Sequence, residues 1–278
     1  MQDIKKKFWL EKFDCFSVTG RDARKFLNGL TTSNILTSEN KVLKTCLLTP
    51  NGVLRSLIEI IFLERNLEVV ILAGKTQEII DYFNQIIFPA DDVFLSDPFL
   101  INRIQEIDEY SSWRLYQPIF FKTEDKEFEI HKNKLNLLNS NDLKLWKVNQ
   151  AIPSLDMEIN GKNNPLELGL KDLIDFNKGC YLGQETMSKI KNVSSLKQEI
   201  RIWQSYESYL NLDVEDKNLY INSAKDISAG KITSLFKSDS QIKGLAIIKR
   251  KYLEEGSNLY SEIFGKIIIN KSVGSIFL

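Results

Sequence analysis

The pattern of apolar and polar positions in the first half of the chain alternates between strand-like runs and helix-like spacing. Ala23, Phe26, Leu27 and Leu30 recur at helical intervals, which places them on one face of a helix. A second amphipathic helix is predicted over residues 76–87, and Pro89 ends it. Strands are predicted at 13–18, 42–48, 53–63, 67–72 and 93–95, with a turn at Pro50-Asn51-Gly52.

Short strand-like segments separated by glycines and polar turns dominate the chain from about residue 194. This succession is typical of a small antiparallel barrel. Residues 100–145 show a mixed pattern, and the polar residues 139–142 favour a loop. The mixture of hairpins and helices predicts an α+β protein with mixed or antiparallel sheets rather than a doubly wound parallel sheet. The strands predicted in the second half are 200–206, 219–221, 230–236, 244–249 and 265–269.

The charges of the chain balance, because 37 Lys and Arg residues face 37 Asp and Glu residues. A balanced total gives no electrostatic footprint for a nucleic acid, and we expect no direct nucleic-acid partner. No run approaches the ~18 apolar residues of a membrane-spanning helix. The basic start of the chain also lacks the apolar segment of a targeting peptide. We therefore expect a cytoplasmic protein without a membrane partner.

Three cysteines and one histidine limit the metal chemistry of the chain. Cys15, Cys46 and Cys180 are far apart and form no CxxC pair, which favours reduced thiols over a disulfide framework or a zinc site. His131 lies in a polar run and excludes a multi-histidine site. We predict no stable metal.

Residues 165–191, PLELGLKDLIDFNKGCYLGQETMSKIK, combine glycines with reactive and charged side chains. Gln184, Glu185 and Lys189 have helical spacing, and a carboxylate such as Glu185 can accept two hydrogen bonds from a pterin-like N–H pair. Tyr181 can stack on a flat heterocycle. Cys180 lies beside Lys178 near a helix start, where positive charge favours a thiolate. The same residues also have a purely structural interpretation, with Glu185 and Lys189 as a solvated surface pair and Cys180 as a small buried apolar residue. The functional and the structural interpretations both remain open.

The string KGCYLGQE, Lys178–Glu185, matches the KGCYxGQE motif of YgfZ-type proteins, which are relatives of the glycine-cleavage T-protein. Val18-Thr19-Gly20, Leu48-Thr49-Pro50-Asn51-Gly52 and Gly244-Leu245-Ala246 are similar to further family blocks, so the resemblance covers most of the chain. The resemblance implies a three-domain, T-protein-like folate-binding fold. Its parts are a discontinuous folate-binding α+β domain (1–45 with about 110–192), an inserted α+β domain (about 46–109) and a C-terminal antiparallel β-barrel (about 196–278).

The same resemblance implies a function. Proteins of this family bind tetrahydrofolate and support the assembly or repair of iron–sulfur proteins, with effects on tRNA modification by iron–sulfur enzymes. For this chain it implies tetrahydrofolate as the cofactor and iron–sulfur proteins or their assembly factors as partners. Cys180 is then the candidate reactive thiol, and the folate-binding residues are Lys178, Tyr181, Gln184, Glu185 and Lys189.

The chain departs from the T-protein pattern where aminomethyl transfer needs an acid. T-protein relatives carry a G-x-x-D-D type string, and the matching residues here are Gly52-Val53-Leu54-Arg55-Ser56. Because Arg55 and Ser56 replace the acidic residues, we expect no aminomethyltransferase activity, and whether the chain catalyses any reaction stays open. Lys189 and Lys147 stand where the family has arginine, and the two residue types differ at a bidentate site.

Two other functions remain as alternatives. A carboxylate from elsewhere in the fold can supply the missing acid, which would restore T-protein-type aminomethyltransferase chemistry. The predicted barrel also resembles folds that bind oligonucleotides, which makes an RNA-binding module the second alternative. Its candidate residues are the aromatic Trp203, Tyr206, Tyr209, Tyr220 and Phe236, with the basic Lys249-Arg250-Lys251.

Overall fold

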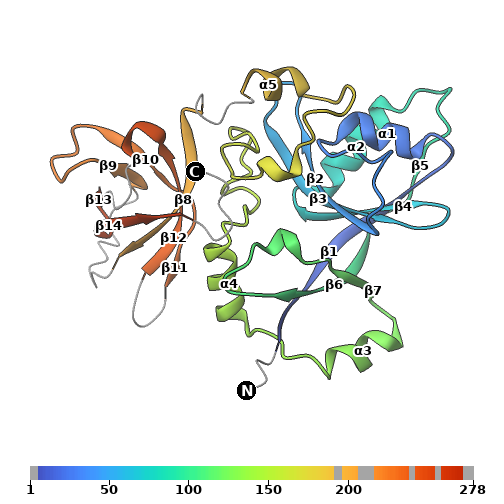
Figure 1. Ribbon diagram of the computed structural model, residues 1–278, viewed down its shortest axis with the longest axis horizontal. Coiled ribbons are helices and arrows are strands. Elements are labelled where there is room, and N and C mark those ends of the chain that lie inside the picture. Colours follow the sequence, from blue (N-terminus) through green and yellow to red (C-terminus); the bar gives the residue numbers. More distant parts are fainter. Residues whose placement is uncertain (1–5, 191–195, 206–215, 238–241, 254–257, 272–278) are drawn as a thin grey trace. The chain divides into compact units, whose positions relative to one another are not determined.

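The computed structural model describes residues 6–190, 196–205, 216–237, 242–253 and 258–271. These residues form two compact units. The first comprises the described residues of 1–139, 154–165 and 171–191, and the second comprises those of 140–153, 166–170 and 192–278. Each unit contains one antiparallel sheet (Figure 1). The predicted α+β class is therefore confirmed.

The sheet of the first unit has the strand order β2-β3-β4-β1-β6-β7, in which β6 is Phe99–Ile107 and β7 is Ile119–Lys122. Strand β5 pairs with the end of β1. The long strand β1 (Lys7–Thr19) is central: its first part pairs with β6 and its last part with β4. The elements predicted in this half are confirmed to within two residues, except that β1 begins earlier. They are α1 (Ala23–Leu30), β2 (Val42–Leu48), β3 (Leu54–Phe62), β4 (Leu67–Ala73), α2 (Thr76–Ile86) and β5 (Phe94–Leu95).

Helices α1 and α2 lie together on one face of this sheet (Figure 1). The apolar positions that predicted the two helices are the ones that bury: Leu27 from α1 and Phe83 from α2 pack into one core with Phe16 and Ile58 of the strands. The ring of Phe26 meets the ring of Phe83 edge to face, with 5.4 Å between centroids. Burial of this face is the main stabilising term of the unit.

The opposite face of the sheet carries a buried ion pair. Arg103 of β6 (Phe99–Ile107) donates from Nε and Nη2 to the carboxylate of Glu59 on β3, at 2.6 and 2.8 Å. Neither side chain is exposed to solvent. The Nζ of Lys44 lies 3.7 Å from the same carboxylate, and Trp9 covers the guanidinium at 4.2 Å. A pair that is bidentate and flanked in this way offsets part of its desolvation cost.

The segment between residues 100 and 150 differs most from its prediction. The mixed pattern of this segment does not predict strand β6. In the structure β6 is followed by β7 (Ile119–Lys122) and α3 (Lys126–Lys132). The loop predicted at 139–142 was wrong, because helix α4 (Ser140–Asn149) begins there. Ser140, Asn141 and Asp142 are residues that favour helix starts as strongly as they favour loops.

The sheet of the second unit closes on itself, which confirms the predicted C-terminal barrel. Its strand order is β10-β9-β13-β14-β8-β12-β11, and β10 also pairs with β12, so six strands form the closed barrel. Helix α4 packs against β11 and β12, where Lys243 Nζ donates to Asn149 Oδ1 at 3.1 Å. The strands are β8 (Gln198–Ser205), β9 (Asn218–Tyr220), β10 (Ser228–Ile232), β11 (Phe236–Lys237), β12 (Ile242–Lys249), β13 (Asn258–Ser261) and β14 (Gly265–Asn270).

One of the aromatic residues considered for RNA binding is buried in the core of the barrel. Trp203 is fully buried against Phe264, with 4.8 Å between ring centroids, and its Nε1 donates to the carbonyl oxygen of Leu245 at 3.2 Å. Tyr206 and Tyr209 lie outside the described residues. Trp203 is therefore a packing residue of the barrel.

The first sheet crosses both boundaries expected near residues 45 and 109, because β2 pairs with β3 and β6 pairs with β7. The three-domain division stays a prediction at this level. Among the described helices, none has the length and apolar character needed to cross a membrane.

Candidate functional site

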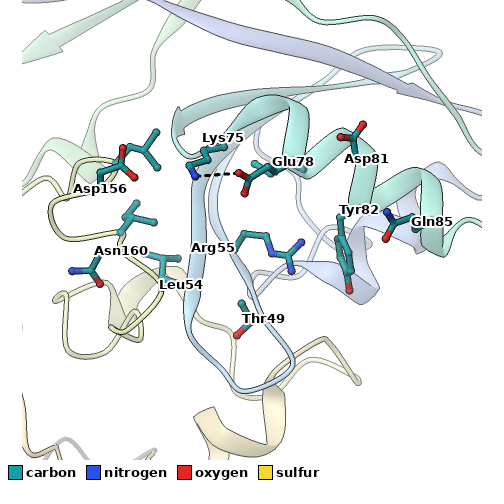
Figure 2. Close-up of a pocket in the computed structure, with 14 residues that line it drawn as sticks. Thr49, Leu54, Arg55, Lys75, Glu78, Asp81, Tyr82, Gln85, Asp156 and Asn160 are labelled. Carbon is teal, nitrogen blue, oxygen red and sulfur yellow. Dashed lines mark ion pairs between the residues drawn. The ribbon is translucent and has the colours of Figure 1, made fainter.

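The first unit contains a pocket with a volume of about 760 Å³ (Figure 2). This volume lies in the range of small-molecule sites, roughly 300–1,000 Å³. Three segments line it: the start of β3 with the turn before it, the polar face of α2, and the loop over residues 155–161. The lining side chains include Thr49, Leu54, Arg55, Lys75, Glu78, Asp81, Tyr82, Gln85, Asp156 and Asn160.

Local sequence explains how α2 comes to line the pocket. Its apolar residues Ile79, Ile80 and Phe83 are buried in the core under the sheet. Glu78, Asp81, Tyr82 and Gln85 therefore occupy the other side of the helix, where they border the pocket.

The loop on the other side of the pocket is tied down by hydrogen bonds. The Leu54 N–H donates to the carbonyl oxygen of Asn163 at 2.9 Å, which attaches the loop to the start of β3. Ser154 donates from its N–H and its hydroxyl to Glu158 Oε2, at 3.0 and 2.9 Å. Asp156 holds a left-handed backbone with φ of 63°, an unfavourable conformation that places its carboxylate at the pocket.

Most charged groups of the pocket have a partner. Lys75 forms an ion pair with Glu78 at 3.1 Å, and Glu78 followed by Asp156 raises the pKa of Lys75. Gln77 Nε2 donates to Asp81 Oδ1 at 2.8 Å. Arg55 differs, because its guanidinium lies over the ring of Tyr82, 4.0 Å from the centroid, and no hydrogen bond or ion pair joins that guanidinium to a described residue.

Arg55 and Ser56, the two replacements of the T-protein acids, have different surroundings. Arg55 lines the pocket. Ser56 is fully buried, and its hydroxyl donates to the carbonyl oxygen of Ala73 at 2.9 Å. Neither residue provides an acid. The pocket does contain carboxylates that the sequence analysis did not single out: Glu78, Asp81 and Asp156. The sequence signal for Glu78 and Asp81 was the polar face of α2, which also carries Tyr82, whereas Asp156 lies in the loop over 155–161.

The side chain of Lys178, at the start of the KGCYLGQE string, caps the C-terminal end of helix α1. Its Nζ donates to the carbonyl oxygens of Asn28, Thr31 and Ser33, at 2.6, 2.8 and 2.8 Å. These carbonyls lie at the C-terminal end of the helix, where a cation is favoured. Burial lowers the pKa of Lys178 to about 8, while Asp175 acts in the opposite direction. All three ammonium protons are used within the protein.

Tyr181 and Gln184 lie close to Lys178. The Lys178 ammonium is 5.3 Å from the centroid of the Tyr181 ring, and Gln184 Nε2 donates to the Lys178 carbonyl oxygen at 3.5 Å. Tyr181 is buried, and its hydroxyl has no hydrogen-bond partner among the described residues. Burial, then Cys46 and Asp175, raises the pKa of Tyr181 to about 12. The structure thus brings three of the six predicted site residues together.

The other three predicted site residues are exposed. Glu185 and Lys189 form an ion pair at 2.5 Å on helix α5 (Gln184–Lys189), and this partner lowers the pKa of Glu185. Cys180 carries a free, exposed thiol. The side chains of these six residues do not line the pocket, so their folate-binding or reactive roles stay predictions.

The remaining metal-ligand candidates are dispersed. Cys15 and Cys46 are buried free thiols, and burial raises the pKa of both, that of Cys46 to about 12. His131 lies in α3 with its ring 5.2 Å from that of Phe121. The described residues contain no group of three or more His, Cys, Asp or Glu placed to hold a metal ion. Lys147 lies in α4, in the second unit.

A backbone contact links the KGCYLGQE string to the pocket. Gly183 packs against Thr49 and Gly52, the ends of the turn before β3, and Thr49 lines the pocket. The string therefore supports the segment that forms one wall of the pocket.

The fold has a known counterpart. The chain resembles a crystal structure of glycine cleavage system aminomethyltransferase T from Bartonella henselae, with a TM-score of 0.73 over 95% of this chain and 84% of that chain. The two sequences are 10% identical, so the likeness concerns the fold alone. The T-protein-like fold expected from the sequence is confirmed.

Sequence similarity to a curated protein covers a shorter part of the chain than the structural likeness does. The chain is 30% identical over 115 residues to "Putative transferase At1g60990, chloroplastic" from Arabidopsis thaliana. The match covers 41% of this chain and 25% of the relative's length. No family model matches the chain.

Proposed function

We propose that the protein is a tetrahydrofolate-binding accessory protein of the YgfZ type. It supports the assembly or repair of iron–sulfur proteins and, through iron–sulfur enzymes, tRNA modification. The observation that supports this proposal most directly is the contact of Gly183 with the Thr49–Gly52 turn. It connects the family's characteristic string with a pocket of suitable size, about 760 Å³.

The residues of the pocket fit the chemistry of a reduced folate. Asp81 and Asp156 can accept hydrogen bonds from the N–H groups of a pterin, and Tyr82 offers an aromatic ring. When bound, tetrahydrofolate supplies a carrier for one-carbon groups.

Binding without aminomethyl transfer is the expected behaviour. Arg55 and Ser56 hold the positions of the T-protein acids, and the Ser56 hydroxyl is committed to Ala73. A cation at the first position opposes the approach of a second cation, such as a protonated amine.

Calorimetric titration with tetrahydrofolate tests the ligand and its location together. Wild type is compared with Tyr82→Ala in the pocket, Glu185→Ala in the string and Tyr110→Ala, whose side chain is 88% exposed, as the matched control. We expect micromolar binding that Tyr82→Ala weakens and Tyr110→Ala leaves unchanged. A loss confined to Glu185→Ala would move the site to helix α5, and an inert wild-type protein would reject folate as the ligand.

The role in iron–sulfur metabolism needs a separate test. Cells lacking this protein are complemented with wild type, Cys180→Ser or an empty vector, and the product of an iron–sulfur tRNA-modifying enzyme is quantified. We expect wild type to restore the modification. Restoration by Cys180→Ser would remove the thiol from the mechanism, and equal modification in all three strains would reject the accessory role.

A T-protein-type aminomethyltransferase is the second candidate function. The observation that favours it is the group of carboxylates Glu78, Asp81 and Asp156 in the same pocket as Arg55. Release of ammonia from an aminomethyl donor in the presence of tetrahydrofolate, lost in Asp156→Asn, would establish this activity. Absence of ammonia from folate-bound protein would leave the accessory role.

A further inference from the structure

Arg55 is a cation with unused hydrogen-bonding capacity at the wall of the pocket. Its guanidinium carries five N–H donors, and none of them bonds to a described residue. The other cation of the pocket, Lys75, is paired with Glu78 at 3.1 Å. The carboxylate of Asp81 accepts from Gln77. Arg55 is therefore the cation of the pocket best able to take an anionic partner from outside.

Tyr82 fixes the orientation of that guanidinium. The guanidinium carbon lies 4.0 Å from the centroid of the Tyr82 ring, which is the distance of a cation–π contact (Figure 2). Held on the ring, a guanidinium keeps the N–H groups of its edge available as a planar fork. Such a fork matches the two oxygens of a carboxylate, and less of its conformational entropy remains to be lost on binding.

The surrounding charges discriminate between anions. Glu78, Asp81 and Asp156 line the same pocket as Arg55 and Lys75, so acids outnumber bases. A phosphate dianion would face these three carboxylates with one available cation. A carboxylate monoanion matches the single unpaired positive charge and the planar shape of the fork.

We propose that this pocket binds a carboxylate-bearing ligand whose carboxylate pairs with Arg55. Compared with the acid-bearing T-protein string, the charge at this position is inverted, and the preferred partner changes from an amine to an acid. The inference rests on the pocket alone and does not require folate. The carboxylate belongs either to the glutamate tail of a folate or to a separate small acid.

Calorimetry with four probes tests the inference and separates these sources. The probes are 5-formyltetrahydrofolate, p-aminobenzoylglutamate, a reduced pterin without the glutamate tail, and inorganic phosphate. Each is titrated into wild type, Arg55→Gln, Arg55→Lys and Arg65→Gln, the last being an exposed arginine of the β3–β4 turn that serves as the matched control. Thermal unfolding of each variant verifies that the fold is retained.

We expect the carboxylate probes to bind wild type, and Arg55→Gln to weaken their binding by about 10- to 100-fold, as for the loss of charged hydrogen bonds. Arg55→Lys keeps the charge without the planar fork, so its affinity for the carboxylate probes should lie between those of wild type and Arg55→Gln. Arg65→Gln should match wild type, and phosphate should bind more weakly than either carboxylate probe. Added salt should weaken the carboxylate probes more than the tail-less pterin.

The outcomes distinguish this inference from the proposed function. If 5-formyltetrahydrofolate binds wild type and Arg55→Gln equally, folate binding stands and the Arg55 inference is overturned. If the pterin and 5-formyltetrahydrofolate fail while p-aminobenzoylglutamate binds through Arg55, the inference stands and the folate proposal falls. If no carboxylate probe binds wild type at millimolar concentration, or phosphate binds as tightly as they do, the inference is overturned.

Discussion

Gly183 and Gly52 pack against each other, and both have a positive φ, 81° and 76°. A Cβ on Gly183 would lie 3.1 Å from the Cα of Gly52 and 2.8 Å from the carbonyl oxygen of Thr49. A Cβ on Gly52 would lie 2.7 Å from the Cβ of Thr186. The KGCYLGQE string and the turn before β3 therefore fit together only where both positions lack a side chain.

Gly183→Ala should destabilise the protein by about 2–5 kcal/mol. The left-handed backbone contributes about 1–2 kcal/mol for a residue with a Cβ, and the overpacked contact contributes about 1–3 kcal/mol. Because Thr49 lines the pocket, ligand affinity should fall as well. Urea unfolding and calorimetry measure the two effects.

Gly179→Ala is the matched control, because a Cβ at Gly179 would meet no atom within 4 Å. Its effect on the free energy of unfolding should stay within about 0.5 kcal/mol. Equal losses of unfolding free energy in Gly183→Ala and Gly179→Ala would show that the string does not support the turn through Gly183.

Lys178→Met should cost about 2–5 kcal/mol of unfolding free energy. The substitution keeps most of the apolar stem but leaves the carbonyl oxygens of Asn28, Thr31 and Ser33 without their donor. Lys189→Met is the control and should leave stability unchanged, because that ion pair is exposed. A Lys178→Met protein that keeps its stability and loses folate affinity would instead assign Lys178 to the ligand.

Tyr181→Phe should leave the stability unchanged or raise it by up to ~1 kcal/mol. The buried Tyr181 hydroxyl has no partner among the described residues, so its removal relieves a desolvation cost while the ring keeps its packing. Tyr181→Leu, which removes the ring, should destabilise and serves as the comparison in thermal unfolding. A loss above 1 kcal/mol in Tyr181→Phe would show that the hydroxyl has a partner in the folded protein.

The sequence predicted those elements whose apolar residues face the core with a regular period. The helical spacing from Ala23 to Leu30 and the apolar runs of β2, β3 and β4 correspond to buried faces, and these elements were placed to within two residues. Strand β6 escaped prediction because Asn102, Arg103 and Gln105 are polar and yet buried. A polar residue in a strand indicates a solvent-facing position unless its partner is known. The partner of Arg103 is Glu59, which is 44 positions away in the chain.

The pocket was harder to foresee than the fold. Its walls come from β3, α2 and the loop over 155–161, and no local pattern indicates that Arg55, Tyr82 and Asp156 border one cavity. The KGCYLGQE string could be singled out from the sequence by its composition and by its match to a family motif. In the structure Lys178 and Gly183 of that string hold α1 and the turn before β3, so part of its information concerns architecture.

The Glu59–Arg103 pair gives the sharpest test of the buried face of the sheet. Glu59→Gln should destabilise the protein by about 3–5 kcal/mol, because the guanidinium of Arg103 would remain buried without its counter-charge. The double variant Glu59→Leu with Arg103→Met removes both charges and should lose less than the single variant, since apolar side chains can replace a buried pair. Urea unfolding of wild type, both variants and the exposed control Glu64→Gln measures the difference. A double variant at least as unstable as Glu59→Gln would show that the pair stabilises the fold beyond its own desolvation cost, through Lys44 and Trp9 around it.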